Sequence, residues 1–399
     1  PQSHPEPNPD SRGEAGAVDP YRELIVTDLL VVRDGRAAES LDDAPWSLRS
    51  QLRWLAGSAK DDVAFTLAWL EEWRDRTSVG EHNAPLTPRP RLDELLVLPW
   101  FSPGSSPTGA NHEGSYGSSG TSSTTPPSSN WRSFPFQLIA IVNRIDLASE
   151  ACSGSAGELR FVYSGIDPVA GRPPNLTLIV EVPYPQDRTP SEWAAAWHAL
   201  GSLPPGESYN AELERLTRAV REGADPFSAR LRTNEQALGT STGAPWELRE
   251  FRLEHREENR RLVHSPLEFT PPSNVNRTAL DTHLVSHADA VLEGAVALPP
   301  ELRAGAAQVT TPSFTWPASN LGESLRKAFS RETCNGCHGG DTATLPFQHI
   351  APSTSAGAAR LSRFLDAPGS ENDELSRRKA ALESLLEQRC DPEPTMPTY

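Results

Sequence analysis

Three apolar runs in the middle of the chain form its clearest pattern of hydrophobic and polar positions. Segments 136–147 (FQLIAIVNRIDL), 158–164 (ELRFVYS) and 176–182 (LTLIVEV) are continuously apolar or alternate with polar residues, and Gly, Pro and Asn bound them. Runs of this length and composition are typical of β-strands. Because the connections are too short for crossover helices, the three runs predict one antiparallel sheet.

Helical spacing of apolar residues predicts helices before and after these strands. The segments that show it are 46–56, 61–76, 191–200, 209–222 and 277–293. The last segment carries His283 and His287 on one helical face, which resembles half of a metal site. No zincin-type carboxylate motif accompanies the pair, so we expect a structural role for it.

Two further stretches predict strands outside this central group. Segment 21–34 contains LIVTDLLVV, which is short and β-branched and favours one or two strands. Segments 246–253 and 262–269 suggest another hairpin.

Two polar segments have almost nothing to bury. Segment 102–133 is rich in Ser, Gly, Thr and Pro, and predicts a surface loop or linker because burial cannot offset its ordering entropy. Segment 1–20 is polar and rich in proline, and we expect it to be a disordered tail that remains after removal of an export signal.

The charge balance limits the partners. The formal net charge is −16 and the isoelectric point is near 5.1, which disfavours binding to nucleic acid or to an acidic membrane surface. No apolar run approaches the roughly 20 residues that a membrane-spanning helix needs, so we expect no membrane span.

The most informative stretch lies near the carboxyl end. Segment 320–340 (NLGESLRKAFSRETCNGCHGG) contains Cys334, Cys337 and His338 in the order Cys-x-x-Cys-His. Two thiols at this spacing can each add to one vinyl group of a single porphyrin, while the adjacent imidazole reaches the iron. We therefore predict one covalently attached haem c on these three residues.

The context of this motif resembles the c-type cytochrome domain. An apolar stripe of Leu321, Leu325 and Phe329 predicts a helix that delivers Cys334 at its end. In that family a helix leads into the motif and a C-terminal helix packs across it, which segment 371–389 fits. The resemblance covers about 311–390 and is specific only at the haem motif.

The sixth iron ligand is open from the sequence. The family's methionine ligand normally precedes the closing helix, but Met396, the only methionine, follows it. His349 is the stronger candidate because it follows the motif on a loop long enough to fold over the ring. Met396, His283 or His287, and an open or water-bound iron remain alternatives. Two histidine ligands would lower the reduction potential relative to His and Met, whereas an open site would invite oxygen or peroxide chemistry.

Cys334 and Cys337 also allow other chemistries. They could form a disulfide, part of a metal site or a redox-active dithiol. A zinc site needs two more ligands, and Cys152 and Cys390 are the only spare thiols. A thioredoxin-like dithiol stands at the start of a helix just after a strand, whereas a helix is expected to run into this motif. Cys152 and Cys390 could instead bond to each other in an exported chain.

Beyond the haem motif, the chain resembles large exported proteins of Gram-negative bacteria. In these proteins, segments like IVNRIDL and ELRFVYS precede a terminal TCNGCHG. The resemblance implies export and haem, and hence a periplasmic or extracellular location. It assigns no role to the first 310 residues.

Together these observations predict an α+β protein with an antiparallel sheet and flanking helices, joined to a small, mostly helical, cytochrome c-like C-terminal domain. The expected divisions are a tail at 1–20, a mixed helical region at 21–101, a loop at 102–133, the sheet region at 134–310 and the haem domain at 311–399. The predicted function is single-electron transfer with a redox partner protein. The alternatives are a haem peroxidase or oxidase with its substrate between the domains, and an envelope binding protein with a secondary haem.

Overall fold

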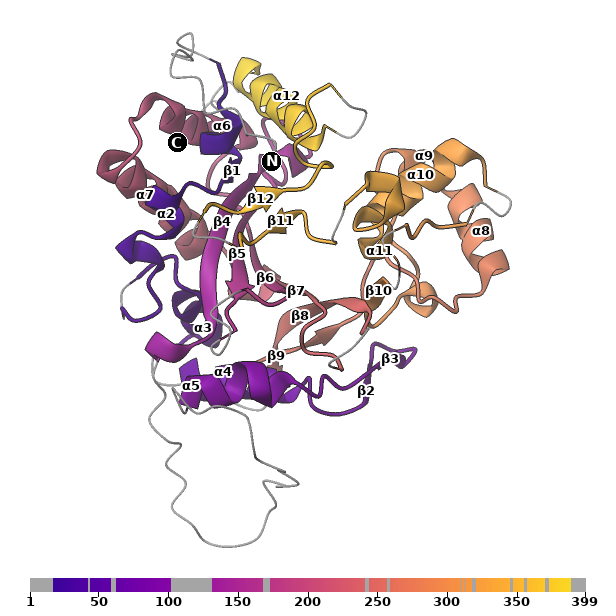
Figure 1. Ribbon diagram of the computed structural model, residues 1–399. Coiled ribbons are helices and arrows are strands. Elements are labelled where there is room, and N and C mark those ends of the chain that lie inside the picture. The colour runs from indigo at the N-terminus through magenta and orange to yellow at the C-terminus, as the bar shows by residue number, and fades with distance from the viewer. Residues whose placement is uncertain are drawn as a thin grey trace, which may run out of the picture.

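The fold was analysed in a computed structural model of the chain. It describes residues 17–41, 44–58, 62–101, 131–167, 173–240, 244–256, 259–309, 311, 313–317, 321–344, 347–354, 357–369 and 373–388. Most of the predicted tail and loop, together with Met396 and Cys390, lies outside these residues. Helices pack against an antiparallel sheet, so the predicted α+β class is confirmed (Figure 1).

The central sheet has eight strands within the described residues, in the order β1-β4-β5-β6-β7-β8-β10, with β9 paired to β8. Each pairing in it is antiparallel. The strands are β1 (Ile25–Val26), β4 (Phe136–Arg144), β5 (Glu158–Gly165), β6 (Leu176–Pro183), β7 (Arg230–Glu235), β8 (Trp246–Arg256), β9 (Asn259–Ser265) and β10 (Ala307–Val309). Two small hairpins lie outside it, namely β2 (Thr77–Val79) with β3 (Ala84–Leu86), and β11 (Ile350–Ala351) with β12 (Arg360–Leu361).

The three apolar runs form β4, β5 and β6, and the predicted β8–β9 hairpin is also confirmed. The strand prediction for segment 21–34 is mostly wrong. Only β1 is a strand there, between α1 (Pro20–Glu23) and α2 (Leu29–Val32). The side chain of Asp28 accepts a hydrogen bond from the Leu30 backbone amide at 2.8 Å, and this cap starts a helical turn in an apolar run.

Helices pack on one face of this sheet and enclose the main core. The predicted helices are confirmed as α3 (Leu48–Ala56), α4 (Asp62–Glu71), α6 (Pro190–His198) and α7 (Glu207–Gly223). The short helix α5 (Leu98–Phe101) follows α4 at the lower edge of the view (Figure 1). Tryptophans from these helices, including Trp69, Trp100 and Trp193, are buried in the core.

A second, smaller core lies beside the sheet. It is built mainly from α8 (Arg277–Ser286), α9 (Ala288–Leu292) and α10 (Glu323–Glu332), which gather at the right of Figure 1. The predicted helix over 277–293 is therefore two helices, broken at His287. Leu280 and Leu284 of α8 pack with Phe329 of α10 in this core.

The expected closing helix exists as α12 (Glu374–Glu387), but it packs elsewhere than the resemblance implies. It lies against α6 and the turn Ile145–Leu147, and Leu375, Leu382 and Leu385 join the main core. Figure 1 shows α12 across the molecule from α10. The large leucines of α12 fill the space beside the sheet, so this helix does not close over the one that leads into the motif.

Candidate functional site

The Cys-x-x-Cys-His motif forms a separate helical turn. Helix α10 ends at Glu332, Thr333 is extended, and α11 (Cys334–Cys337) begins after it. The Thr333 side chain caps this turn by accepting a hydrogen bond from the Gly336 backbone amide at 3.1 Å. We expected one helix to deliver Cys334 at its end. Cys334 does follow α10 closely, but the chain turns at Thr333 and the motif forms a second helix.

Close packing fixes α11 against α10. A Cβ atom on Gly336 would collide with the backbone oxygen of Ser330, so only glycine fits there. The Trp316 indole donates to the Thr333 hydroxyl at 2.8 Å and to the Asn335 amide oxygen at 3.2 Å. These contacts hold the backbone that carries both thiols.

An ion pair fixes the segment that follows the motif. The Arg326 guanidinium donates from both terminal nitrogens to the Asp341 carboxylate, each at 2.8 Å, and the Ser330 hydroxyl donates to the same carboxylate at 2.6 Å. Both partners of the ion pair are almost fully buried. The chain before and after the motif is therefore joined by a bidentate contact.

The imidazole of His338 has a defined tautomer. Its Nδ1 lies 2.6 Å from the Phe347 carbonyl oxygen, which can only accept, so Nδ1 carries the proton. The Asn234 side chain of β7 donates to the same carbonyl at 2.6 Å. Burial lowers the pKa of His338 to about 4, so the ring is neutral at pH 7 and its Nε2 has a free lone pair.

His349 lies directly beside His338. The two ring centroids are 4.2 Å apart, and the Nε2 of His349 is 3.3 Å from the sulfur of Cys337. The other nitrogen, Nδ1, lies 3.2 Å from the Ser362 hydroxyl. Burial and the neighbouring His338 keep the pKa of His349 well below its usual range. The structure thus brings together the four residues that the sequence analysis selected.

The alternative ligands do not share this location where they are described. His283 and His287 contact each other on α8 and its end, with ring centroids 4.4 Å apart, beside the second core. Met396 lies outside the described residues.

Both motif thiols are free and protonated. Cys334 and Cys337 are not bonded to each other, so the disulfide alternative does not describe this structure. Burial raises the pKa of both thiols, that of Cys337 to about 12. Since the thiolate is the attacking form in disulfide exchange, this environment disfavours a redox dithiol. Cys152 is disulfide-bonded, and its pairing with Cys390 stays a prediction because Cys390 lies outside the described residues.

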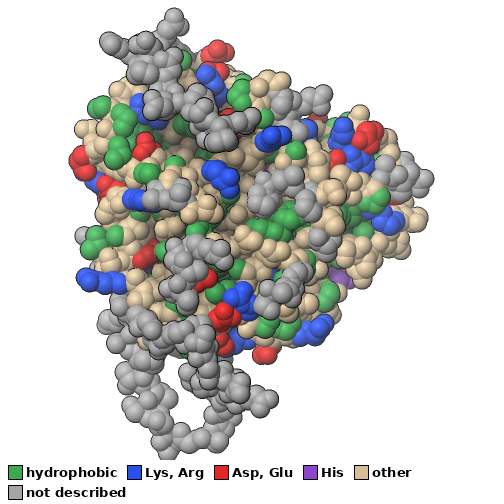
Figure 2. All heavy atoms as spheres, in the orientation of Figure 1, with side chains coloured by type: hydrophobic (Ala, Val, Ile, Leu, Met, Phe, Trp, Pro, Cys, Tyr) green, Lys and Arg blue, Asp and Glu red, His purple; other side chains and the backbone are tan. Residues whose placement is uncertain are grey.

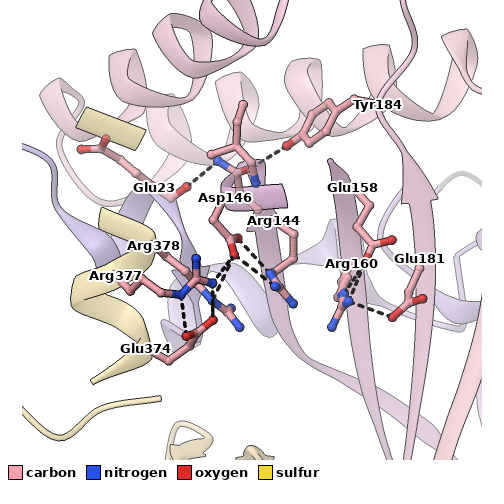
Figure 3. Close-up of polar contacts among 12 residues, drawn as sticks. Glu23, Arg144, Asp146, Glu158, Arg160, Glu181, Tyr184, Glu374, Arg377 and Arg378 are labelled. Atoms are coloured by element: carbon pink, nitrogen blue, oxygen red, sulfur yellow. Dashed lines mark hydrogen bonds and ion pairs between the residues drawn. The ribbon is translucent and has the colours of Figure 1, made fainter. Parts of the chain in front are cut away.

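The sheet face beside the motif carries buried charges that the sequence analysis did not single out. In Figure 3, Arg160 of β5 lies between the carboxylates of Glu158 and Glu181. Asp146 lies between Arg144 and the arginines of α12, with Arg377 at 2.8 Å. The cationic partners keep the pKa of Asp146 well below its usual range despite its burial. Alternating charges in the strands, as in ELRF, were the available signal.

No family model, curated protein or solved structure matches the chain. The likeness to c-type cytochromes therefore rests on the Cys-x-x-Cys-His motif alone.

The motif residues fit a covalently bound haem better than a bare metal ion. Among the side chains that the structure describes, no group of three or more His, Cys, Asp or Glu residues is placed to hold a metal. Two free thiols and an imidazole with a fixed tautomer are the donor set that haem c attachment requires, and the second neutral imidazole could serve as a sixth ligand. The contact between the rings of His338 and His349 leaves no room for a porphyrin between them, so bis-histidine ligation requires the two rings to separate.

Proposed function

We propose that this protein carries one haem c on Cys334, Cys337 and His338 and transfers single electrons. The observation that carries the proposal is the 2.6 Å contact between Nδ1 of His338 and the Phe347 carbonyl. A ligating histidine usually donates its other N–H to such an acceptor, which orients the ring and directs Nε2 at the metal. In a chain with Cys-x-x-Cys-His, this contact would direct Nε2 of His338 at the haem iron.

The two thiols supply the covalent bonds. Each sulfur would bond to one carbon of a vinyl group, and the thiol hydrogen would move to the other carbon, so no oxidant is needed. Their spacing on the single turn of α11 directs both to one porphyrin. When bound, the haem supplies reversible one-electron exchange.

The surrounding residues would then control the site. His338 would bind iron through Nε2, and Asn234 would hold the Phe347 carbonyl that orients it. His349 would provide the sixth ligand after its ring moves away from His338. A filled sixth position favours electron transfer over peroxide or oxygen chemistry, which needs an open site.

The partner and the location are parts of the same proposal. We propose a redox partner protein in the periplasm, where c-type maturation takes place, or outside the cell. The net charge of −16 favours a basic partner. Figure 2 shows acidic and basic side chains scattered over the visible face, with small hydrophobic groups between them. Among the described residues no helix has the length and hydrophobicity to cross a membrane.

A haem assay tests the proposal. The chain should be produced in a host with c-type maturation, purified, and examined by a pyridine haemochrome spectrum and by peroxidase staining of a denaturing gel. We expect one haem per chain that remains attached after denaturation. The double variant Cys334→Ala/Cys337→Ala should lose the stained band, whereas His283→Ala should keep it. A colourless wild-type protein with the mass of the bare chain would overturn the proposal.

A further inference from the structure

Two arginines of the central sheet lie on the face that contacts the haem motif. Arg232 and Asn234 are two residues apart on β7, so their side chains point to the same face, with Cα atoms about 7 Å apart. Asn234 reaches the motif through the Phe347 carbonyl, which accepts hydrogen bonds from both its amide and Nδ1 of His338, each at 2.6 Å. On β5, Arg160 is paired in register with Glu181 of β6, which contacts Arg232 in turn.

Each of these arginines has an unused donor. Arg160 contacts Glu158 and Glu181 through Nε and Nη2, and Arg232 contacts Glu181 and Glu250 through the same two atoms. The Nη1 groups of both have no hydrogen-bond partner among the residues that the structure describes. Their side chains are 21% and 30% exposed, so ligand atoms can reach them.

The charges of both arginines act on the motif. Both are among the groups that lower the pKa of His338. Arg232 also opposes the rise in the pKa of the Cys334 thiol that burial causes. Arg160 also lowers the pKa of His349. Desolvation is nevertheless the largest influence on each of these groups, although Cys334, His338 and His349 keep some exposed surface. The two arginines therefore lie on the sheet face that contacts the motif through Asn234 and the Phe347 carbonyl.

Haem carries two carboxylates on one edge, and each guanidinium can bind a carboxylate through directed N–H groups. We propose that Arg160 and Arg232 bind the two haem carboxylates, so that the large sheet region forms one wall of the haem site. This inference rests on the proposed haem attachment. It gives the sheet region a function that the motif alone does not explain.

The test is the reduction potential of the holoprotein. Arg232→Gln and Arg160→Gln should keep full haem content, because the thioether bonds are made by Cys334 and Cys337. Loss of a cation beside the carboxylates favours ferric iron, so the ratio of ferrous to ferric protein at a fixed ambient potential should fall several-fold. Arg232→Lys should restore most of the ratio because it keeps the charge.

Two further variants separate binding from folding. The double variant Arg232→Gln/Glu250→Gln removes a cation together with a carboxylate partner, so it limits destabilisation and should still change how the haem carboxylates are held. Resonance Raman bands of these carboxylates should therefore shift in it. Arg252→Gln is the matched control, because Arg252 pairs with the same Glu250 at 3.0 Å and is also held by Glu268 at 2.8 Å; this substitution should change the potential little.

The outcomes distinguish the two proposals. If the wild type holds haem, and the Arg160 and Arg232 variants hold it with unchanged potential and carboxylate bands, this inference is overturned while the haem function stands. If the wild type holds no haem, the proposed function fails, and this inference fails with it.

Discussion

The sulfur of Cys337 lies 3.3 Å from Nε2 of His349. This contact joins a residue of α11 to the loop before β11, and it places a second neutral imidazole beside the attachment site. Serine and threonine hydroxyls hold its Nδ1 from the opposite side, at 3.2 Å from Ser362 and 3.3 Å from Thr344. The ring is thus oriented with Nε2 toward the sulfur of Cys337.

The His349→Ala substitution tests whether this imidazole is the sixth ligand. We expect the ferric absorption spectrum of the holoprotein to change from low spin to high spin, and added imidazole to restore the low-spin form. His287→Ala should leave the spectrum unchanged. A low-spin spectrum that persists in His349→Ala would show that another residue is the sixth ligand. Met396→Ala would then be the next variant to measure.

The ion pair of Arg326 and Asp341 predicts a measurable stability cost. Asp341→Ala should lower the free energy of unfolding by about 3 kcal/mol, because it removes the buried carboxylate of the pair and leaves the desolvated guanidinium with the exposed Glu323 as its remaining acidic partner. Denaturant unfolding of the purified protein measures this. The matched control is Glu323→Gln, since Glu323 binds the same guanidinium at 2.9 Å from an exposed position and should matter little. Equal losses in both variants would contradict the argument.

Gly336 predicts a steric requirement inside the motif. Gly336→Ala should lower the free energy of unfolding by about 2 kcal/mol, because the added methyl group meets the Ser330 backbone and the Thr333 hydroxyl. It should also reduce the yield of haem-bound protein, since α11 must shift. Gly322→Ala is the control, because a Cβ there meets no atom of the described residues within 4 Å and the backbone is not strained. Thermal melts and haem content of the two variants provide the comparison.

His264 predicts a loss of stability in mild acid that is independent of haem. Its Nε2 lies 2.9 Å from the Glu72 carbonyl, its buried Nδ1 has no partner among the described residues, and burial together with Arg249 lowers its pKa to about 4. Between these two pKa values, His264 binds a proton in the unfolded chain but not in the folded chain. The free energy of unfolding therefore falls as the pH drops from about 6.5 toward 4.

The substitution His264→Gln removes this titration. The stability difference between pH 7 and pH 5 should then be smaller than in the wild type by about 2 kcal/mol. Denaturant unfolding at the two pH values measures it, with His255→Gln on β8 as the control. An unchanged pH dependence in His264→Gln would show that other groups cause the acid sensitivity.

Much of the fold follows from local sequence signals. Segments β4, β5 and β6 were predictable because apolar runs bounded by turn residues encode a strand within a few positions. The strand β7 escaped prediction because its sequence RLRTNE is polar, and its Arg232 is stabilised by carboxylates on the neighbouring strands β6 and β8. The turn of α2 escaped because a single cap at Asp28 outweighed the β-branched pattern.

The sequence by itself determined that Cys334, Cys337 and His338 lie together, and it predicts haem attachment there, because these residues are consecutive or nearly so and need no folding to bring them together. Only the tertiary structure decided that His349 lies at their side, that α12 packs against α6, and that Arg160 and Arg232 contact the same Glu181. Those relations depend on strand register and on contacts between residues far apart in the chain. The free energy of packing the whole molecule fixes them, and no short segment encodes them.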